Sequence, residues 1–164
     1  MDNIAFQVGY KPGLLGEIVA AHGRYYAANW GFGIFFEAKV GRECGEYLTR
    51  ATAKDLTLSA WSGDTFAGAM ILDLHDPDAP GLAHVRWFIV PLSGLGLGRE
   101  MMRRAMAHLD QAGLPCFLTT FRGLDAARGL YEDFGFHLTD EAEAESWGKR
   151  VTEQRFDRPV QLVE

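Results

Sequence analysis

The sequence predicts a mixed α/β (α+β) fold in which helices flank a central, mainly antiparallel sheet, all within one domain that spans residues 1–164. Three observations predict this fold. Segments of strand-like composition alternate along the chain with segments of helical periodicity. A glycine-rich turn joins a β-branched, aromatic strand to a helix near the middle of the chain. The 164 residues, 48% of them hydrophobic, suffice for one full core and contain no linker that would divide it.

The first part of the chain predicts one strand followed by two helices. Residues 4–10, IAFQVGY, alternate as a short strand does, and Lys11-Pro12-Gly13 ends it. Apolar residues then recur at helical spacing over 13–29 and, after an aromatic segment at 30–35, over 36–51. Glycines interrupt the helical pattern of segment 30–35, and its aromatic residues predict that it lines a pocket.

The second part predicts a hairpin, a central strand, and then alternating helices and strands. Residues 62–64, Ser-Gly-Asp, form the hairpin turn, and Gly113 ends the helix that follows the glycine-rich turn. The expected elements, in order, are strands 56–61, 65–74 and 85–90, a helix to about residue 111, strand 114–121, helix 125–133, a strand that begins over 136–139, an acidic connection at 141–145 and a last strand at 147–156.

The turn after Val90 has glycine at every second position, in the sequence SGLGLG of residues 93–98. Glycine lets backbone N–H groups converge, and the following helix adds the unpaired N–H groups and positive dipole end of its first turn. Such a turn suits a phosphate or pyrophosphate. A Walker A loop would need Lys-Ser/Thr where Arg99-Glu100 stand, and a Rossmann turn would need G-x-G-x-x-G early in the chain. A plain glycine turn without a ligand stays open.

This turn resembles the acetyl-CoA pyrophosphate loop of the GNAT superfamily of N-acetyltransferases, whose pattern is Gln/Arg-x-x-Gly-x-Gly/Ala. Ser93 stands at the Gln/Arg position, and Gly96 and Gly98 stand at the two glycines. Further along, residues 127–136, ARGLYEDFGF, are similar to the family's A-x-x-L-Y-x-x-x-G-F helix-to-strand signature. Leu124 occupies the position of an Asn that commonly contacts the pantetheine arm in the family.

Nearly the whole chain also resembles the acetyltransferase half of two-domain MarR-type regulators and its stand-alone relatives. The segments that carry this resemblance are GYKPGLLGEIVAAHGRYYAANWGFG, FEAKVGRE, AHVRWFIV, TFRGLDAARGLYEDFGF and WGKRVTEQRF. The winged-helix half is absent from this sequence, which removes the main reason to expect DNA binding.

The resemblance implies an acetyl-CoA-dependent N-acetyltransferase that acts by direct transfer on a primary amine of a small molecule or peptide. It also implies that the strand ending near Val90 and the strand from Leu114 splay apart to admit the acetyl donor, acetyl-CoA. Tyr131 would be the acid that protonates the departing thiolate. The implied cofactor-binding residues are Phe88, Ile89 and Val90 for the pantetheine amides, Ser93, Gly94, Leu95, Gly96, Leu97, Gly98 and Arg99 for the pyrophosphate, and Leu124.

The general base for the acceptor amine has two candidates. His84 precedes the pantetheine segment, and an imidazole titrates in the useful pH range. Glu37 begins the second helix beside the aromatic segment. Each has an equally good structural interpretation, as a histidine satisfied by hydrogen bonds and as a carboxylate favoured by the helix dipole. The candidate substrate-pocket residues are Phe32, Arg86, Trp87 and Trp147, although aromatic side chains more often belong to the core than to a recognition site.

Composition limits the other classes of function. A formal net charge of −6, from 16 Lys+Arg against 22 Asp+Glu, argues against nucleic acid as the main partner. Neither a membrane-spanning run nor a signal-peptide pattern is present, which predicts a cytoplasmic protein. Cys44 and Cys116 are expected to be buried and give little support to a disulfide or metal site.

Three functions remain open: the acetyltransferase, an acyl-CoA-binding sensor and a nucleotide-binding protein that does not use CoA. The expected partners are acetyl-CoA and an amine acceptor, and a homodimer stays open. A domain without turnover would be a catalytically silent acyl-CoA-binding sensor. A nucleotide-binding protein that does not use CoA is the weaker alternative, because the phosphate-binding Lys and the acidic ribose partner are missing.

Overall fold

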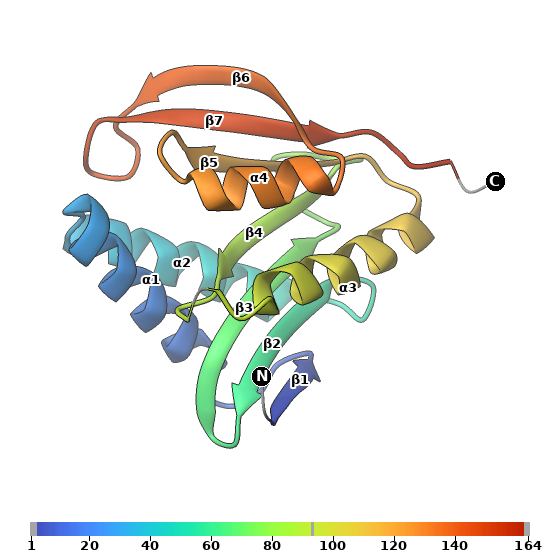
Figure 1. Cartoon of the computed structure of the whole chain (residues 1–164), viewed down its shortest axis with the longest axis horizontal. Helices are drawn as coiled ribbons and strands as arrows, with labels where there is room; N and C mark the ends of the chain where they lie inside the picture. Colours follow the sequence, from blue (N-terminus) through green and yellow to red (C-terminus); the bar gives the residue numbers. More distant parts are fainter. Residues whose placement is uncertain (1–2, 93, 163–164) are drawn as a thin grey trace.

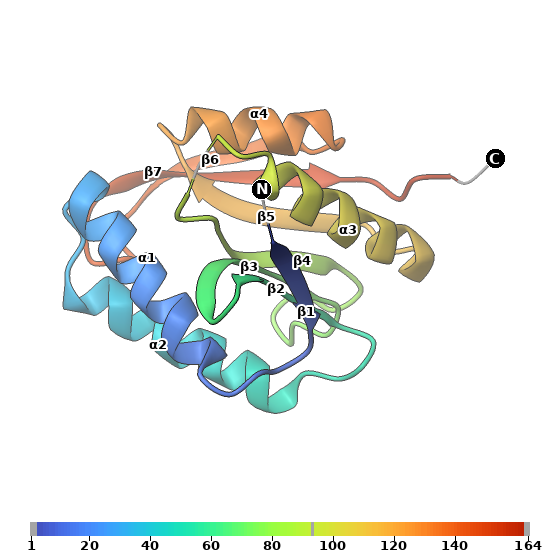
Figure 2. The ribbon, with the colours of Figure 1, turned by 60° about the horizontal axis from the view of Figure 1, so that its bottom comes forward.

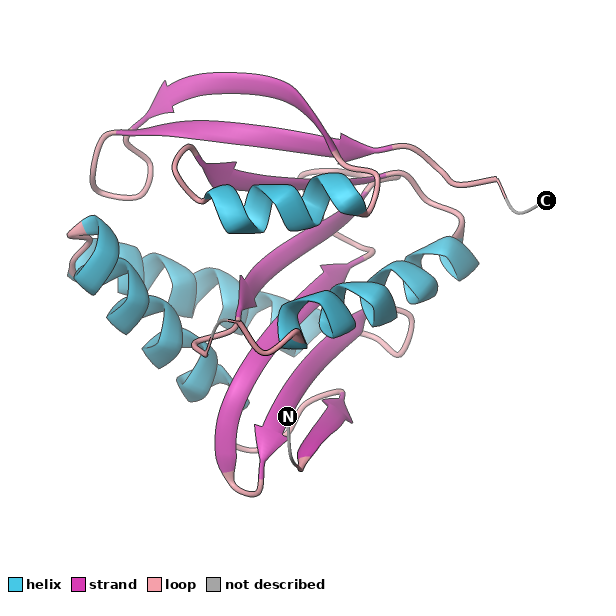
Figure 3. Ribbon diagram, viewed as in Figure 1, coloured by secondary structure: helices cyan, strands magenta, loops and turns pink. Residues whose placement is uncertain are grey.

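The computed structural model describes residues 3–92 and 94–162, which form one sheet and the helices on its two faces. The elements, shown in Figures 1 and 3, are β1 (Ile4–Val8), α1 (Leu14–Trp30), α2 (Ile34–Arg50), β2 (Leu56–Ser62), β3 (Thr65–Asp73), β4 (Ala83–Ile89), α3 (Leu97–Ala112), β5 (Cys116–Phe121), α4 (Asp125–Asp133), β6 (His137–Ala144) and β7 (Val151–Arg158).

The strands form a seven-stranded sheet in the order β1-β2-β3-β4-β5-β7-β6. Only β4 and β5 pair in parallel, and the other neighbouring strands pair antiparallel. This arrangement confirms the predicted mixed, mainly antiparallel fold. The hairpin between β2 and β3 turns at Gly63 and Asp64, where Gly63 has a left-handed φ of 61°.

The helices cover both faces of the sheet, with α1 and α2 on one face and α3 and α4 on the other (Figure 2). Each face has its own core. On the α3 face, Met101, Met102 and Leu109 of α3 are fully buried against β2, β3 and β4. On the opposite face, the core of α1 and α2 contains Leu14, Ile18, Phe36, Val40, Cys44 and Tyr47. The predicted helical faces therefore become the two cores.

The parallel pair β4–β5 separates soon after it begins. Its ladder contains only Ala83↔Cys116 and His84↔Phe117, so the later part of β4 has no partner strand on the β5 side. On its other side, β4 pairs with β3 and contains one extra residue between Arg86 and Ile89. Trp87 lies in this bulge with a positive φ of 46°, which is rare for a non-glycine residue. The two strands splay apart as the sequence predicts, and Figure 1 shows them diverging.

The C-terminal hairpin corrects the expected boundaries. The acidic residues 141–145 were expected to form a connection, but most of them belong to β6, and the last strand begins at Val151 instead of Trp147. β6 is an edge strand with both faces exposed, so acidic side chains meet no desolvation cost there. Arg122 and Arg150 also form salt bridges with Glu141 and Glu143.

Smaller differences concern the helix starts and the turns. Helix α2 begins at Ile34, so only residues 31–33 separate it from α1, and half of the expected aromatic segment 30–35 is helical. Gly148 occupies a turn at φ 86°, closed by its N–H to the Glu145 carbonyl at 3.0 Å, which delays β7. Both cysteines are buried free thiols, as predicted. In residues 3–92 and 94–162, no helix has the length and apolar character that crossing a membrane requires.

Candidate active site

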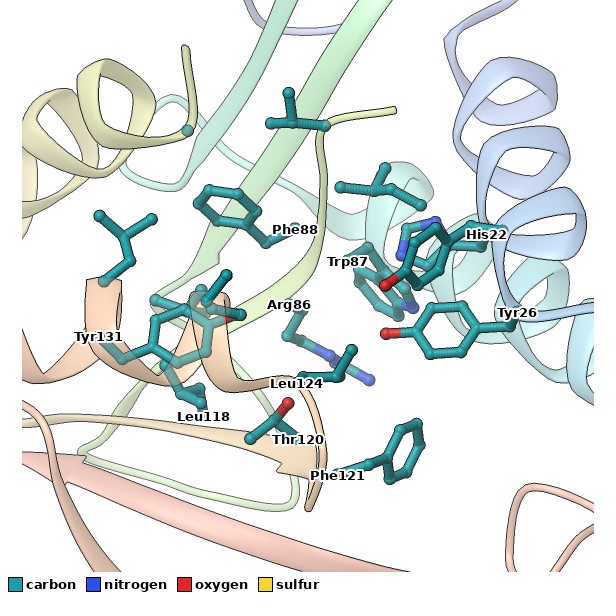
Figure 4. A pocket seen from close by; sticks show the side chains of 18 of the residues that line it. His22, Tyr26, Arg86, Trp87, Phe88, Leu118, Thr120, Phe121, Leu124 and Tyr131 are labelled. Carbon is teal, nitrogen blue, oxygen red and sulfur yellow. The ribbon is translucent and has the colours of Figure 1, made fainter. Parts of the chain in front are cut away.

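A cavity of about 1200 Å³ lies where β4 and β5 separate. Its walls come from the glycine-rich turn and the start of α3 at one end, and from α1, α2 and the C-terminal hairpin at the other. The strand β4 and the start of α4 lie between these ends. The cavity therefore connects the predicted cofactor turn with an aromatic pocket on the opposite face of the sheet (Figure 4).

The glycine-rich turn and the first turn of α3 bring backbone N–H groups to the wall of this cavity. Gly94 and Gly96 have left-handed φ values of 85° and 74°, and Gly96 is the N-cap of α3. The first helical bond after it is donated by the Glu100 N–H to the Gly96 carbonyl, so the N–H groups of residues 97–99 have no partner within the helix. Predicted residues 94–99 all line the cavity, and Ser93 lies outside the described residues. Their arrangement suits a pyrophosphate.

The open edge of β4 continues from this turn. Phe88, Ile89 and Val90 line the cavity on the stretch of β4 and its end that β5 does not reach. An extended chain with amide groups could pair with these backbone atoms as an added strand. Leu124 also lines the cavity, at the N-cap of α4.

Tyr131 projects from α4 toward the cavity between the two halves (Figure 4). Its ring makes edge contacts with Phe88 at a centroid distance of 6.4 Å and with Phe136 at 6.2 Å. Burial raises the pKa of the phenol to about 12, so the hydroxyl keeps its proton near neutral pH. The site thus holds a protonated phenol at the wall of the cavity.

Aromatic rings form the other half of the cavity. Tyr26 and Phe36 contact each other at 4.8 Å between ring centroids, and Phe121 and Trp147 do so at 5.6 Å. Trp147 donates a hydrogen bond from Nε1 to Glu153 Oε2 at 3.1 Å. Phe32, a predicted pocket residue, is buried behind this wall and does not line the cavity, whereas Trp87 and Trp147 do.

Arg86 crosses the floor of the cavity and is held in place by a buried carboxylate. Its guanidinium donates from Nη1 to Asp73 Oδ2 at 3.3 Å and lies 4.1 Å from the centroid of the Trp87 ring. Asp73 is fully buried and also accepts two hydrogen bonds from Arg50. The two arginines compensate the charge of Asp73, and Arg86 is thereby oriented beside the bulge.

Of the two candidates for the general base, His84 lines the cavity and Glu37 does not. His84 lines the cavity, but its Nδ1 is 2.8 Å from Asp76 Oδ2 and its ring stacks on Phe117 at 4.1 Å. Burial lowers the pKa of His84 to about 4, although the hydrogen bond to Asp76 opposes this shift. Glu37 lies in the first turn of α2 against Gly23 and is not among the residues that line the cavity.

Three residues of α1, His22, Tyr25 and Tyr26, line the cavity without having been predicted as site residues. His22 and Tyr26 lie one helical turn apart, with their rings stacked at 6.2 Å, and reach toward Trp87 (Figure 4). Burial and the nearby Tyr131 phenol raise the pKa of Tyr26, so the two phenols share one environment. In the sequence, the i, i+4 spacing of His22 and Tyr26 within an otherwise apolar helix face was the signal that could have identified them as site residues.

Comparison with known proteins identifies the family. Residues 22–136, more than half of the chain, match the profile of the acetyltransferase (GNAT) family. No curated protein matches this chain at a significant level. The resemblance to the acetyltransferase half of MarR-type regulators stays a prediction.

Solved structures share the fold. The ribosomal-protein-S18-alanine N-acetyltransferase from Escherichia coli is similar with a TM-score of 0.67 and 15% identity, over 98% of this chain and 96% of that chain. yncA from Salmonella typhimurium, a provisionally assigned acetyltransferase solved with its cofactor acetyl-CoA, gives 0.72 and 14% over 98% and 95%. An acetyltransferase from Streptococcus agalactiae gives 0.71 and 15% over 97% and 99%. The family match and the shared fold together show that this chain belongs to the acetyltransferase (GNAT) family.

Proposed function

We propose that this protein is an acetyl-CoA-dependent N-acetyltransferase that transfers the acetyl group directly to a primary amine of a small molecule or peptide. The observation that carries the proposal is the single cavity that joins the glycine-rich turn and Tyr131 to the aromatic pocket. A donor and an acceptor entering from opposite ends would meet beside the β4 bulge. Placing both reactants in one cavity supplies most of what a direct transfer needs.

The described residues fit acetyl-CoA at the turn end. The N–H groups of residues 97–99, which have no partner within α3, suit its pyrophosphate, and the open edge of β4 suits its two pantetheine amides. Acetyl-CoA supplies an activated thioester carbonyl. The chain then has to position that carbonyl, remove a proton from the amine and protonate the departing sulfur.

Tyr131 fits the last of these tasks. Its phenol keeps its proton at neutral pH and lines the cavity beside Phe88. The new C–N bond forms as the C–S bond breaks, and the phenolic proton passes to the thiolate. The amine proton leaves in the opposite direction, toward the aromatic half of the cavity. No described cysteine or serine is needed as a covalent nucleophile.

A thiol-release assay with a panel of amines tests the proposal. The panel contains 2-phenylethylamine, spermidine, free lysine and a peptide that begins with alanine, each with saturating acetyl-CoA. We expect amine-dependent release of CoA with at least one member, and mass spectrometry should show the acetylated product. Acetyl-CoA binding without transfer to any amine would contradict the proposal and favour the silent sensor, for which the comparisons give no support.

A further inference from the structure

His22 occupies an unusual position for a histidine on an apolar helix face. It lies in the middle of α1, is only 5% exposed, and lines the cavity beside Tyr26 and Trp87 (Figure 4). A core histidine normally has both ring nitrogens satisfied by protein groups. In His22, Nδ1 is hydrogen-bonded to the protein and Nε2 is not, and this difference indicates that Nε2 is available to bind a ligand.

The hydrogen bond of one nitrogen fixes the tautomer. Nδ1 lies 2.8 Å from the Ile18 carbonyl oxygen, which can only accept, so Nδ1 carries the proton and donates it. The neutral ring then has its lone pair at Nε2. Nε2 has no hydrogen-bond partner among the described residues, and every fully buried side-chain nitrogen or oxygen in that part of the chain has one. Nε2 therefore retains accessible surface, which faces the cavity.

The lone pair is available at neutral pH. Burial lowers the pKa of His22 to about 4, against a smaller raising effect of the Ile18 hydrogen bond. The imidazole is therefore neutral, and Nε2 is an acceptor instead of a donor. A neutral ring also does not repel an approaching amine.

The two glutamates that line the cavity are already engaged. Glu43 forms a salt bridge with Lys39 at 2.9 Å, and Glu153 accepts the Trp147 Nε1–H. The Nε2 of His84 likewise has no hydrogen-bond partner among the described residues, but His84 lies four residues before Phe88, which is about 13 Å along an extended strand. Of the two histidines that line the cavity, His22 is the one that lies beside Tyr26 and Trp87, and its Nε2 has no partner among the described residues.

We propose that His22 is the catalytic residue that binds the acceptor amine through Nε2 and takes its proton during transfer. This inference rests on the proposed function. The amine N–H donates to Nε2, which directs the nitrogen lone pair at the thioester carbonyl. As the C–N bond forms, the nitrogen becomes cationic and far more acidic, so a weak base suffices to take the proton. The C–S bond breaks and the sulfur takes the Tyr131 proton. Nε2 then returns its proton to water, and Tyr131 regains one.

Two substitutions separate binding from proton transfer. His22→Gln keeps a hydrogen-bond acceptor near the Nε2 position but is not basic, whereas His22→Phe keeps the ring volume and has no acceptor. We expect His22→Gln to keep the KM for the amine within a few fold and to lower kcat about a hundredfold. His22→Phe should lower kcat/KM further by raising KM. His108→Gln, at a half-buried histidine of α3 that does not line the cavity, is the matched control and should match the wild type.

Acetyl-CoA affinity, measured by calorimetry, should be the same in all these proteins. This measurement distinguishes the loss of a general base from misfolding or damage to the acetyl-CoA site, because only the latter two lower the affinity for acetyl-CoA. Wild-type kcat in His22→Gln, with chemistry rate-limiting, would overturn the proposal. Loss of acetyl-CoA binding in both His22 variants would assign the residue a structural role instead.

A spectroscopic measurement keeps the proposal testable if no amine in the panel is a substrate. In ¹⁵N-labelled protein, the two-bond ¹⁵N–¹H spectrum should show His22 with Nδ1 protonated and Nε2 bare. Adding 2-phenylethylamine in the presence of CoA should shift the Nε2 resonance, and His108 should not respond. A protonated Nε2, or no shift with any amine of the panel, would overturn the proposal. A shift without turnover would retain the amine site and contradict the proposed transferase function alone.

Discussion

Burial determines what the individual polar residues of the site can do. The phenol of Tyr131 and the imidazole of His22 lie on opposite walls of one cavity, and burial moves the pKa of each away from its usual value in the direction that favours the neutral form. A neutral phenol donates a proton and a neutral imidazole accepts one. At the scale of single residues, burial thus keeps both groups neutral, which the proposed acid and base roles require.

The role of Tyr131 can be tested by removing its hydroxyl alone. Tyr131→Phe keeps the ring contacts with Phe88 and Phe136, so the fold should survive. We expect turnover to fall by about a hundredfold, the low end for general acid catalysis, because water can partly replace the phenol. Acetyl-CoA affinity should not change. The exposed Tyr10→Phe is the control. Unchanged turnover, with chemistry rate-limiting, would leave Tyr131 as a packing residue.

The two buried histidines also make stability depend on pH. In the folded state the pKa values of His22 and His84 are lowered from 6.5 to about 4, so the unfolded chain binds more protons between these values. The free energy of unfolding should therefore be greatest above pH 6.5 and fall as the pH drops toward 4, by about 1.4 kcal/mol per pH unit for each histidine. Buried Asp55 and Asp76, whose pKa values are lowered below 3.8, would add to this loss only at lower pH.

Urea unfolding between pH 7.5 and 4.5 measures this effect. The slope should become smaller in His22→Phe, which removes one of the two titrating groups without introducing another. A wild-type profile that is flat across this interval would show that the histidines are accessible to protons in the folded protein.

At the scale of elements, the backbone conformation of the glycine-rich turn is the feature to test. A Cβ at Gly96 would meet no atom of the described residues within 4 Å, so the cost of a substitution comes from its φ of 74°. A residue with a side chain pays about 1–2 kcal/mol in this conformation, or moves the N–H groups that follow.

Gly96→Val should therefore weaken acetyl-CoA binding more than it lowers stability. Gly113→Val is a matched control, because Gly113 ends the same helix at φ 68° with open space around it. The two variants should lose similar stability in urea unfolding, and only Gly96→Val should lose affinity in calorimetry. Equal affinity in wild type and Gly96→Val would count against the assignment of the turn.

In the whole molecule, the cavity lies where β4 and β5 separate. A ligand that contacts both strands should therefore stabilise the fold. A ligand present at a hundred times its Kd adds about 2.7 kcal/mol. For a domain of this size, that corresponds to a rise in Tm of roughly 5–10 °C. Acetyl-CoA should produce this shift in a thermal melt, whereas ATP, which lacks the pantetheine arm, should produce less. An equal shift with both would favour a nucleotide-binding protein that does not use CoA.

Local patterns in the amino-acid sequence account for the order of the elements, the two apolar helix faces and the glycine-rich turn, whereas the splayed strand pair was implied by the family resemblance. The first three features follow from local periodicity and from glycine, which act over a few residues. The tertiary structure decided the rest. In the folded chain, residues 141–144 belong to an exposed edge strand. Glu37 lies outside the cavity, whereas His22 lines it. Such outcomes depend on which segments meet across the sheet, because desolvation and hydrogen bonding arise from neighbours that are distant in the sequence.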